Sequence, residues 1–580
     1  MRSRKPRMVL IYILVVSVAS VSNAQAGYSF DECKDRVLGF KNGSINHIGK
    51  VTSSNFGDFL YNGSVHGLND GFPRQEYIAV TYQGCVEICG NPIQLNTAPQ
   101  ALSLASTWVF PLAILLSLPY DSLHKRKIRR TLEAVLKWLG SPQTALTATI
   151  FNVRQMRECF RQSNQVNGDT HRAREAYFIL SCLNQFDFPL GVRRSRRRRD
   201  LEFVDAVLYG LFRPLAVRHA NEPEVQYLQQ LLSVLAFQLR MLRRRGVVPT
   251  LISLGTFLVA FVFSVVLAFA DLGMDTTAFS LALGLLYSWL PLLVAFTIID
   301  RNPVSADPRW LYNVNAVYQW KPTPAARREP AWWTDEDDIP EQYELGMFIG
   351  QGRRIRYNCL AYAVVQDLYR NKRTINLATG TMDVGACAVR VRGHLAGGRP
   401  ISWVSINVAS LLLVWTEVLM SVMIAFNAPT VGLGCRSLTY LLFGIFSTVS
   451  WIVQFWSRPH WTARRLSTVF NTLAVVDLAA IILFQLTGVF NNCYCKSASL
   501  GLPSYGGYMD FENAQFYKES FSVIPYWATA TVIGGFIPLS ALVTALFWWM
   551  DCKDIWKANE VHVEHRNGAN SVRANLNWLR

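Results

Sequence analysis

Long apolar runs alternate with charged segments along this chain. The apolar runs cover residues 101–120, 248–270, 276–299, 401–427, 436–456, 469–489 and 523–548. A helix of about 20 residues is long enough to cross a hydrocarbon core of about 30 Å. The strict alternation of barrel strands is absent from these runs, and an isolated strand would leave its backbone polar groups unpaired in lipid. The pattern therefore predicts an all-α polytopic membrane protein with seven transmembrane helices.

The first 26 residues have the organisation of a signal peptide. Arg2, Arg4, Lys5 and Arg7 precede an apolar stretch at 8–21, and Ala24-Gln25-Ala26 matches the small-x-small cleavage pattern. Cleavage would place Gly27 and the following residues outside the cytoplasm. The alternative is an uncleaved N-terminal anchor.

Charge supports an N-terminus outside and a C-terminus in the cytoplasm. Lys and Arg should be enriched in cytoplasmic segments. They number 23 against 11 Asp and Glu in 121–247, and 14 against 11 in 300–400. The short turn 457–468 contains three arginines and no acid, whereas the predicted outer segments 27–100 and 490–522 contain more acids than bases. The tail 549–580 would then be cytoplasmic.

Sequons and cysteines follow the same division. Asn42 and Asn62 lie in Asn-Gly-Ser sequons in the predicted outer segment, so we expect both to be glycosylated. An even set of cysteines also lies outside, where disulfides form, although the sequence leaves fifteen full pairings open. These disulfide candidates are Cys33, Cys85, Cys89, Cys435, Cys493 and Cys495. Segment 27–100 is expected to be a small disulfide-stapled unit, either a cap on the bundle or a binding module.

The two large inner segments are interpreted as interaction loops. Basic clusters lie at 125–130, 193–199 and 243–245, and 223–242 has the apolar spacing of an amphipathic helix. Such clusters attract anionic lipid head groups, although positive-inside topology alone would also explain them. The segments could equally bind a cytoplasmic protein partner. Topology accounts for the net charge of +17, so we expect no nucleic-acid binding.

Two acidic residues lie inside apolar runs, Glu417 in 401–427 and Asp477 in 469–489. A charge at the bilayer centre is costly, so such acids are normally neutralised, paired or exposed to a wet cavity. Asn407, Gln454 and Asn471 could supply hydrogen bonds across helices. Counted from the inner ends, Asp477 lies at a depth of roughly 12 Å and Glu417 at roughly 24 Å, so the spacing does not favour a close carboxylate pair. The acids either bind an ion, proton or polar ligand, or fix helix packing.

One stretch resembles a known group of sequences. Residues 101–108 and 119–122, followed by Trp138-Leu139-Gly140-Ser141-Pro142, are similar to uncharacterised multispan membrane proteins of filamentous fungi. The resemblance covers only the surroundings of the first apolar run and implies no activity.

Function is predicted only by class. No catalytic nucleophile, base or metal constellation is recognisable, so we expect neither an enzyme nor a bound cofactor or metal. A membrane sensor or scaffold of the secretory pathway, at the plasma membrane rather than an internal membrane, is the first hypothesis. The alternative is a proton- or cation-coupled transporter or channel that uses Glu417 and Asp477.

Overall fold

The computed structural model describes a little over half of the chain. The described residues are 30–61, 79–90, 95–109, 136–165, 170–182, 247–270, 275–300, 360–370, 401–426, 432–456, 461–497, 507–510 and 523–556, with short stretches and single positions at 112, 208, 211–212, 215, 232–233, 236, 321–322, 328–329, 375–376, 381–382 and 389–391. The predicted signal peptide, Asn62, Cys359, Cys387 and the basic clusters at 125–130, 193–199 and 243–245 lie outside them.

Five described helical segments are long and apolar enough to cross a membrane. They are Ala278–Phe296, Ser402–Phe426, Cys435–Phe455, Arg465–Thr487 and Pro525–Ile555. The last four belong to α18 (Ile401–Phe426), α19 (Cys435–Trp456), α20 (Trp461–Thr487) and α23 (Val523–Cys552). Large apolar side chains remain exposed on α18, α19, α20 and α23, as expected of surfaces that face lipid. The structure is therefore that of a mainly helical protein suited to a membrane.

Two further expected spans are described less fully. α12 (Val247–Ala270) contains a shorter apolar helix, Leu254–Ala270, whose outer face exposes several large apolar side chains. The first expected span is described as α5 (Ala98–Leu104), the π-helical turn η2 (Ala105–Val109) and Leu112. Trp108 of η2 is fully buried, and its indole N–H donates to Ser280 Oγ at 2.8 Å.

The third expected span is a broken helix. α13 (Asp275–Leu286) ends one turn before α14 (Trp289–Asp300), and Tyr287 and Ser288 form the break. Pro291 explains the position of the break, because proline lacks an N–H and its ring clashes with the carbonyl four residues earlier, here Tyr287. The Ser288 N–H accordingly bonds to the Leu285 carbonyl, three residues back, at 3.1 Å.

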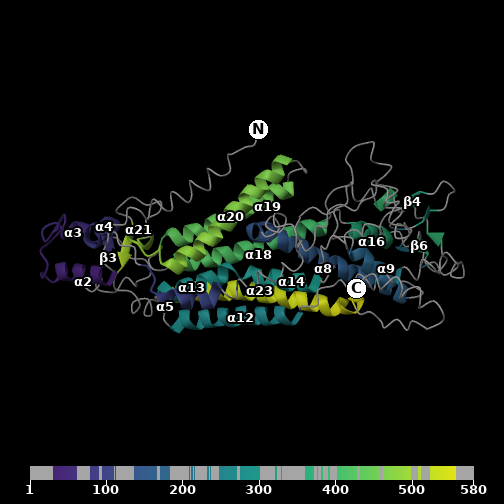
Figure 1. The fold of residues 1–580 in the computed structure, drawn as a ribbon, viewed down its shortest axis with the longest axis horizontal. Helices are drawn as coiled ribbons and strands as arrows, with labels where there is room; N and C mark the ends of the chain where they lie inside the picture. Colours follow the sequence, from purple (N-terminus) through teal and green to yellow (C-terminus); the bar gives the residue numbers. More distant parts are fainter. Residues whose placement is uncertain are drawn as a thin grey trace, which may run out of the picture.

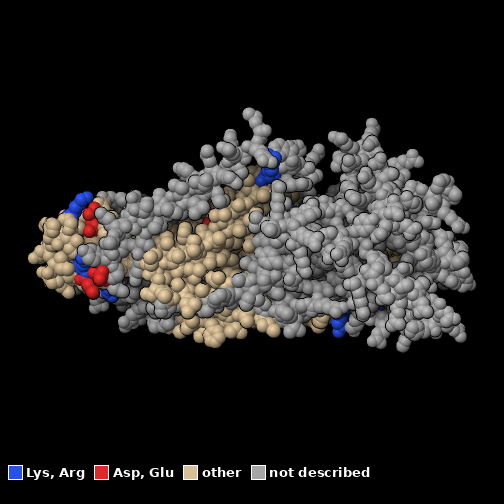
Figure 2. Space-filling view, viewed as in Figure 1, with Lys and Arg blue, Asp and Glu red and all other residues tan. Residues whose placement is uncertain are grey.

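An outer module lies at one end of the bundle (Figure 1). It contains α2 (Phe30–Lys41), β1 (His47–Ile48), β2 (Val51–Thr52), α3 (Phe56–Phe59), β3 (Ala79–Thr81), α4 (Tyr82–Cys89), α21 (Cys493–Lys496) and β8 (Tyr508–Asp510). β3 pairs antiparallel with β8, so the N-terminal segment and the segment between α20 and α23 share one sheet. Charged side chains gather over this module, whereas the neighbouring bundle surface is largely uncharged (Figure 2).

Three disulfides join the outer module and the helix ends. The structure pairs Cys33 with Cys89, Cys85 with Cys493, and Cys435 with Cys495. The second pair connects residues 408 positions apart, and the third joins the start of α19 to α21. Cys33, Cys85, Cys89 and Cys493 are fully buried in the module core.

The helix α8 (Pro142–Asn164) enters the bundle from the opposite end. It packs against α14, α18, α19 and α23, and residues 141–149 are buried without interruption. Modelling a Cβ on Gly140 would place it 2.4 Å from the Asn471 carbonyl oxygen, so the chain before α8 touches the backbone of α20. Part of the segment 121–247 thus reaches between the apolar helices.

The remaining described elements lie near the inner end of α8. They are α9 (Thr170–Cys182), α16 (Leu360–Arg370), the 3-10 turn η11 (Lys553–Trp556) and two hairpins, β4 (Lys321–Pro322) with β5 (Arg328–Glu329) and β6 (Ile375–Asn376) with β7 (Thr381–Met382). The sequence also predicts a short packed helix over 357–369, and α16 confirms it for the described residues. Arg157 of α8 donates to Asp551, at the end of α23, at 2.8 Å from Nε.

Candidate functional site, buried carboxylates at a broken helix

Glu417 lies at the meeting point of three helices. It is fully buried on α18, and Ser288 in the break donates a short hydrogen bond to its Oε2. A Cβ on Gly534 of α23 would lie 3.5 Å from the same oxygen and 2.5 Å from Leu285 Cδ2. Glycine at 534 therefore lets α23 approach the carboxylate and the break together.

The second carboxylate oxygen of Glu417 has no hydrogen-bond partner in the described part of the chain. Oε1 is a buried atom to which no described residue donates, and buried polar atoms in native proteins are nearly always satisfied. Among the described residues, no Lys, Arg or His forms an ion pair with Glu417. The site thus offers a buried oxygen ligand to a proton or a cation.

Ser288 connects the carboxylate to the broken backbone. Its Oγ lies 2.8 Å from the Leu285 carbonyl as well as beside Glu417. One hydroxyl proton can serve only one of these acceptors. Ionised Glu417 requires that proton, whereas protonated Glu417 can donate to Ser288 and leave the proton to Leu285. The hydrogen bonding of the break therefore depends on the proton of Glu417.

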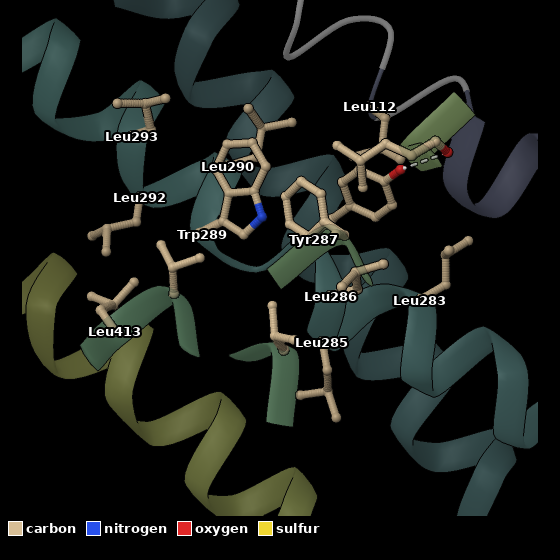
Figure 3. Packing of buried hydrophobic residues seen from close by; sticks show 14 of the residues in the cluster. Leu112, Leu283, Leu285, Leu286, Tyr287, Trp289, Leu290, Leu292, Leu293 and Leu413 are labelled. Atoms are coloured by element: carbon tan, nitrogen blue, oxygen red, sulfur yellow. Dashed lines mark hydrogen bonds between the residues drawn. The ribbon is translucent and has the colours of Figure 1, made fainter. Parts of the chain in front are cut away.

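Asp477 approaches the same break from α20. The Tyr287 hydroxyl donates to the carbonyl of Leu478, the residue after Asp477, at 3.4 Å. Figure 3 shows the rings of Tyr287, in the break, and Trp289, the first residue of α14, next to each other among buried leucines. Asp477 Oδ2 is buried and has no hydrogen-bond partner among the described residues. Ser288 thus bonds to Glu417, and Tyr287 bonds to the residue after Asp477. We call Tyr287, Ser288, Glu417 and Asp477 the acid layer.

The helices α18 and α13 also fix the depth of this layer. Ser421 Oγ, one turn beyond Glu417, donates to the Ala282 carbonyl at 2.6 Å. The two helices run antiparallel, so Ser288 with Glu417 and Ala282 with Ser421 define one register. The spacing of residues along the sequence does not predict these contacts. They depend on the break between α13 and α14, which places Tyr287 and Ser288 on the side of Glu417 and Asp477.

A second buried polar group lies nearer the inner end. Gln143 Nε2 of α8 donates to Ser447 Oγ of α19 at 2.9 Å. Ser450 Oγ donates to Asn471 Oδ1 of α20 at 2.5 Å, and Gln454 Nε2 donates to Ser450 Oγ at 3.1 Å. On α18, Asn407 Nδ2 donates to the carbonyl of Trp403 at 2.8 Å. The side chains of Asn407 and the buried Ser410 form no hydrogen bond to the other described helices, but α18 packs against both α8 and α19. We use the name inner polar layer for these polar residues of four neighbouring helices, namely Gln143, Asn407, Ser410, Ser447, Ser450, Gln454 and Asn471.

The predicted polar residues are therefore divided between two layers. Glu417 and Asp477 belong to the acid layer, while Asn407, Gln454 and Asn471 belong to the inner polar layer. Sequence reasoning missed Gln143, Ser288, Ser410 and Ser421. A signal existed for α18, because 407, 410, 414, 417 and 421 repeat with alternating steps of three and four, the spacing of one helix face.

The outer end of the bundle has its own polar contacts. Arg436 is buried at the start of α19, over the ring of Phe279, and donates to Asn491 Oδ1 at 3.1 Å. The Asn96 amide donates to the carbonyl of Gln485 at 2.8 Å. These contacts join the chain before α5 to the end of α20, and they are consistent with an outer boundary of the bundle.

The remaining predicted sites concern the outer module. Asn42 lies in an exposed turn, where a glycan could be attached without a clash with the core. Sγ atoms of Cys85, Cys89 and Cys493 lie within 4.8 Å of one another, close enough to hold a metal. All three are paired in disulfides, however, and a disulfide sulfur is not the thiolate that metals bind.

Comparisons with known proteins found no relative. No family model, no curated protein and no solved structure matches the chain.

Proposed function

We propose that the protein is a membrane transporter or channel whose cycle is coupled to a proton or cation held at Glu417, with Asp477 as a second acidic group. The observation that carries this proposal is the partnerless Oε1 of fully buried Glu417 beside the break between α13 and α14. Acids inside membranes that face other helices characteristically mark ion and proton pathways. Discontinuous helices near the middle of the membrane are a recurring feature of transport sites.

The surroundings of Glu417 are suited to a conformational cycle. The carboxylate contacts one residue of a broken helix and lies against a glycine of α23. A change in its charge alters the hydrogen bond that Ser288 makes with the broken backbone. Protonation or cation binding would then shift the relative stability of two arrangements of α13, α14 and α23, as a coupled transporter requires.

The test uses the intact chain reconstituted into liposomes that contain a pH-sensitive dye. A pH gradient is imposed, with potassium and valinomycin to clamp the potential, and the rate of proton entry is measured. Glu417→Gln and Asp477→Asn remove the ionisable groups while keeping their shape, so we expect them to reduce the flux at least tenfold. Glu417→Asp keeps a carboxylate, so this variant should retain part of the proton flux. Normal flux in both amide variants would refute the proposal.

A sensor or scaffold is the second candidate. The favouring observation is that a disulfide and the β3–β8 pairing join the outer module to the segment between α20 and α23. A ligand bound to this module could therefore act directly on the bundle. In this candidate, the basic run at 193–199 recruits a cytoplasmic protein or anionic lipid. Deleting 193–199 should then abolish recovery of copurifying partners, and unchanged recovery would contradict it.

The finer topology belongs to the same proposal. We include in it seven spans, a cleaved signal peptide and an N-terminus outside. The supporting observation is that the cysteines expected outside form disulfides together at one end of the helix bundle. Exposed Asn42 lies at that end too. A glycosidase shift that disappears in Asn42→Gln together with Asn62→Gln would support the orientation, and an unglycosylated chain from a secretory host would count against it. Plasma-membrane residence is proposed on the same grounds.

A further inference from the structure

The inner polar layer contains buried oxygen atoms that accept no hydrogen bond from any described residue. Gln143 Oε1, Asn407 Oδ1 and Ser410 Oγ are buried without a hydrogen-bond partner, and they come from two different helices, α8 and α18. The residues that carry them are at most 1% exposed. Amide and hydroxyl oxygens are hard ligands of the kind that hold a hydrated cation or a protonated water.

All described members of this layer are uncharged. Four amides and three hydroxyls make up the layer, so it can lower the energy of a passing cation without trapping it. A conducting path needs sites that bind favourably enough for entry and weakly enough for release. Glu417, by contrast, offers a full or potential negative charge. The inner polar layer is therefore suited to weak, transient binding of a cation, whereas Glu417 is suited to stronger binding of the same type of ion.

Buried apolar residues separate the layers on each of three helices. On α18, Leu413 and Val414 lie between Ser410 and Glu417; on α20, Ala474 lies between Asn471 and Asp477. On α19, Phe443 lies between Ser447 and the buried Tyr440. Val414, Phe443 and Ala474 are each 0% exposed and belong to one hydrophobic cluster. We call these three residues the apolar barrier.

The barrier is thin. Ser410 and Glu417 are seven residues apart on one face of α18, a rise of about 10 Å that contains the buried Leu413 and Val414. Asn471 and Asp477 are six residues apart on α20, which corresponds to about 9 Å. A hydrophobic constriction of this size excludes water when closed, and small changes can wet it.

We propose that the inner polar layer is a second ion site, which takes a proton or a hydrated monovalent cation from the inner side, and that the apolar barrier is the gate between this site and Glu417. The start of α8 forms the inner wall of the site, because Gln143 bonds to Ser447 and Gly140 contacts Asn471. This inference rests on the proposed role of Glu417. It adds the route by which the ion reaches the carboxylate and the point at which that route is closed.

The experiment adds one hydroxyl to the barrier. Ala474→Ser places a hydroxyl between Asn471 and Asp477, and Val414→Ser does so between Ser410 and Glu417. Serine is small and can bond to its own helix backbone, so both changes should preserve the fold. The controls are Ala479→Ser and Val408→Ser, the same substitutions at exposed positions of α20 and α18.

The readout is passive leak in liposomes made from each full-length variant. A pH-sensitive dye reports protons under an imposed pH gradient, and a sodium-sensitive dye reports sodium at constant pH. We expect both barrier variants to increase leak about tenfold, equal to a barrier lower by about 1.4 kcal/mol, while both controls match the unaltered protein. A rise in the proton signal alone identifies a proton path, and a rise in both signals identifies a path for hydrated monovalent cations.

Two failures are distinguishable. If both barrier variants leak no more than their controls while Glu417→Gln still abolishes the basal flux, the gate is refuted and the role of Glu417 stands. If Glu417→Gln leaves the basal flux intact, the proposed function fails whatever the barrier variants do. The two barrier variants lie on different helices, so one misfolded variant cannot decide the result. Elution of each variant as a single species in detergent confirms that it is folded.

Discussion

Ser288 holds the most consequential hydrogen bond at the scale of single residues. Its hydroxyl lies between Glu417 and the carbonyl of Leu285, in a break where the Ser288 N–H bonds three residues back instead of four. A buried carboxyl group that loses its partner carries the full cost of desolvation. The contact is therefore needed for stability as well as for the proposed coupling.

Ser288→Ala should consequently destabilise the folded protein by about 1–3 kcal/mol, the range for a buried polar group left without a partner. Thermal unfolding of the detergent-solubilised protein, followed by loss of the monodisperse species, provides the measurement. Ser540→Ala is the matched control, since Ser540 is exposed on α23 and bonds only to its own helix. Equal unfolding temperatures for the two variants would mean that the Ser288 contact contributes nothing.

Cys159 allows a test of packing on the inner side. It is fully buried in α8, and this burial raises the pKa of its thiol well above the ordinary value, with smaller contributions from Glu158 and Cys182. A raised thiol pKa leaves very little thiolate, the form that reacts. We expect no alkylation of Cys159 by maleimide at pH 8 in the native protein, and complete alkylation after unfolding in detergent. Mass spectrometry of the Cys159 peptide checks this, and rapid native labelling would show that α8 is exposed.

At the scale of elements, α8 is the least expected feature. Its sequence contains three arginines and a glutamate among many polar residues, so nothing in its composition predicts entry between apolar helices. The explanation is that small and polar side chains near its start match polar side chains on α19, as in the bond from Gln143 to Ser447. Polar pairing of this kind is visible only when both partners are known.

Gly140 should tolerate no side chain, because a Cβ there would meet the backbone carbonyl of Asn471 at 2.4 Å and its Cα at 2.6 Å. Backbone cannot move aside as a flexible side chain can, so Gly140→Ala should cost about 1–3 kcal/mol, as overpacking does. Gly255→Ala is the control, since a Cβ at Gly255 in α12 meets nothing within 4 Å. The unfolding temperature should fall for Gly140→Ala alone. A fall of equal size in both variants would contradict the close approach.

The helices differ in how far the sequence predicts their contacts. The face of α18 that contains Asn407, Ser410, Glu417 and Ser421 could be derived from spacing alone, because helical neighbours recur at steps of three and four. The break at Tyr287 and Ser288 was signalled by Pro291, although the sequence does not say that Glu417 would lie beside it. The hydropathy of a segment reveals the length and apolar character of a helix. It does not reveal which faces of two helices contact each other.

At the scale of the whole molecule, the mainly helical structure and its long apolar helices agree with the sequence pattern. The pairing of the outer cysteines could not be derived, since six cysteines allow fifteen pairings and spacing does not distinguish them. The fold selects one pairing because β3–β8 pairing brings the N-terminal segment to the loop that contains Cys493. Long-range contacts of this type depend on the complete arrangement of the chain.

That arrangement predicts a covalent link across the chain. If a specific protease site is inserted within residues 331–350, cleavage divides the chain, but Cys85–Cys493 should still join the two fragments. We therefore expect one full-size band on a denaturing gel without reductant and two smaller bands with it. Cys493→Ser should give two bands without reductant. Cys495→Ser should not, because Cys435–Cys495 lies entirely within the C-terminal fragment. Two bands from the cleaved, unreduced and otherwise unaltered protein would refute the pairing of Cys85 with Cys493.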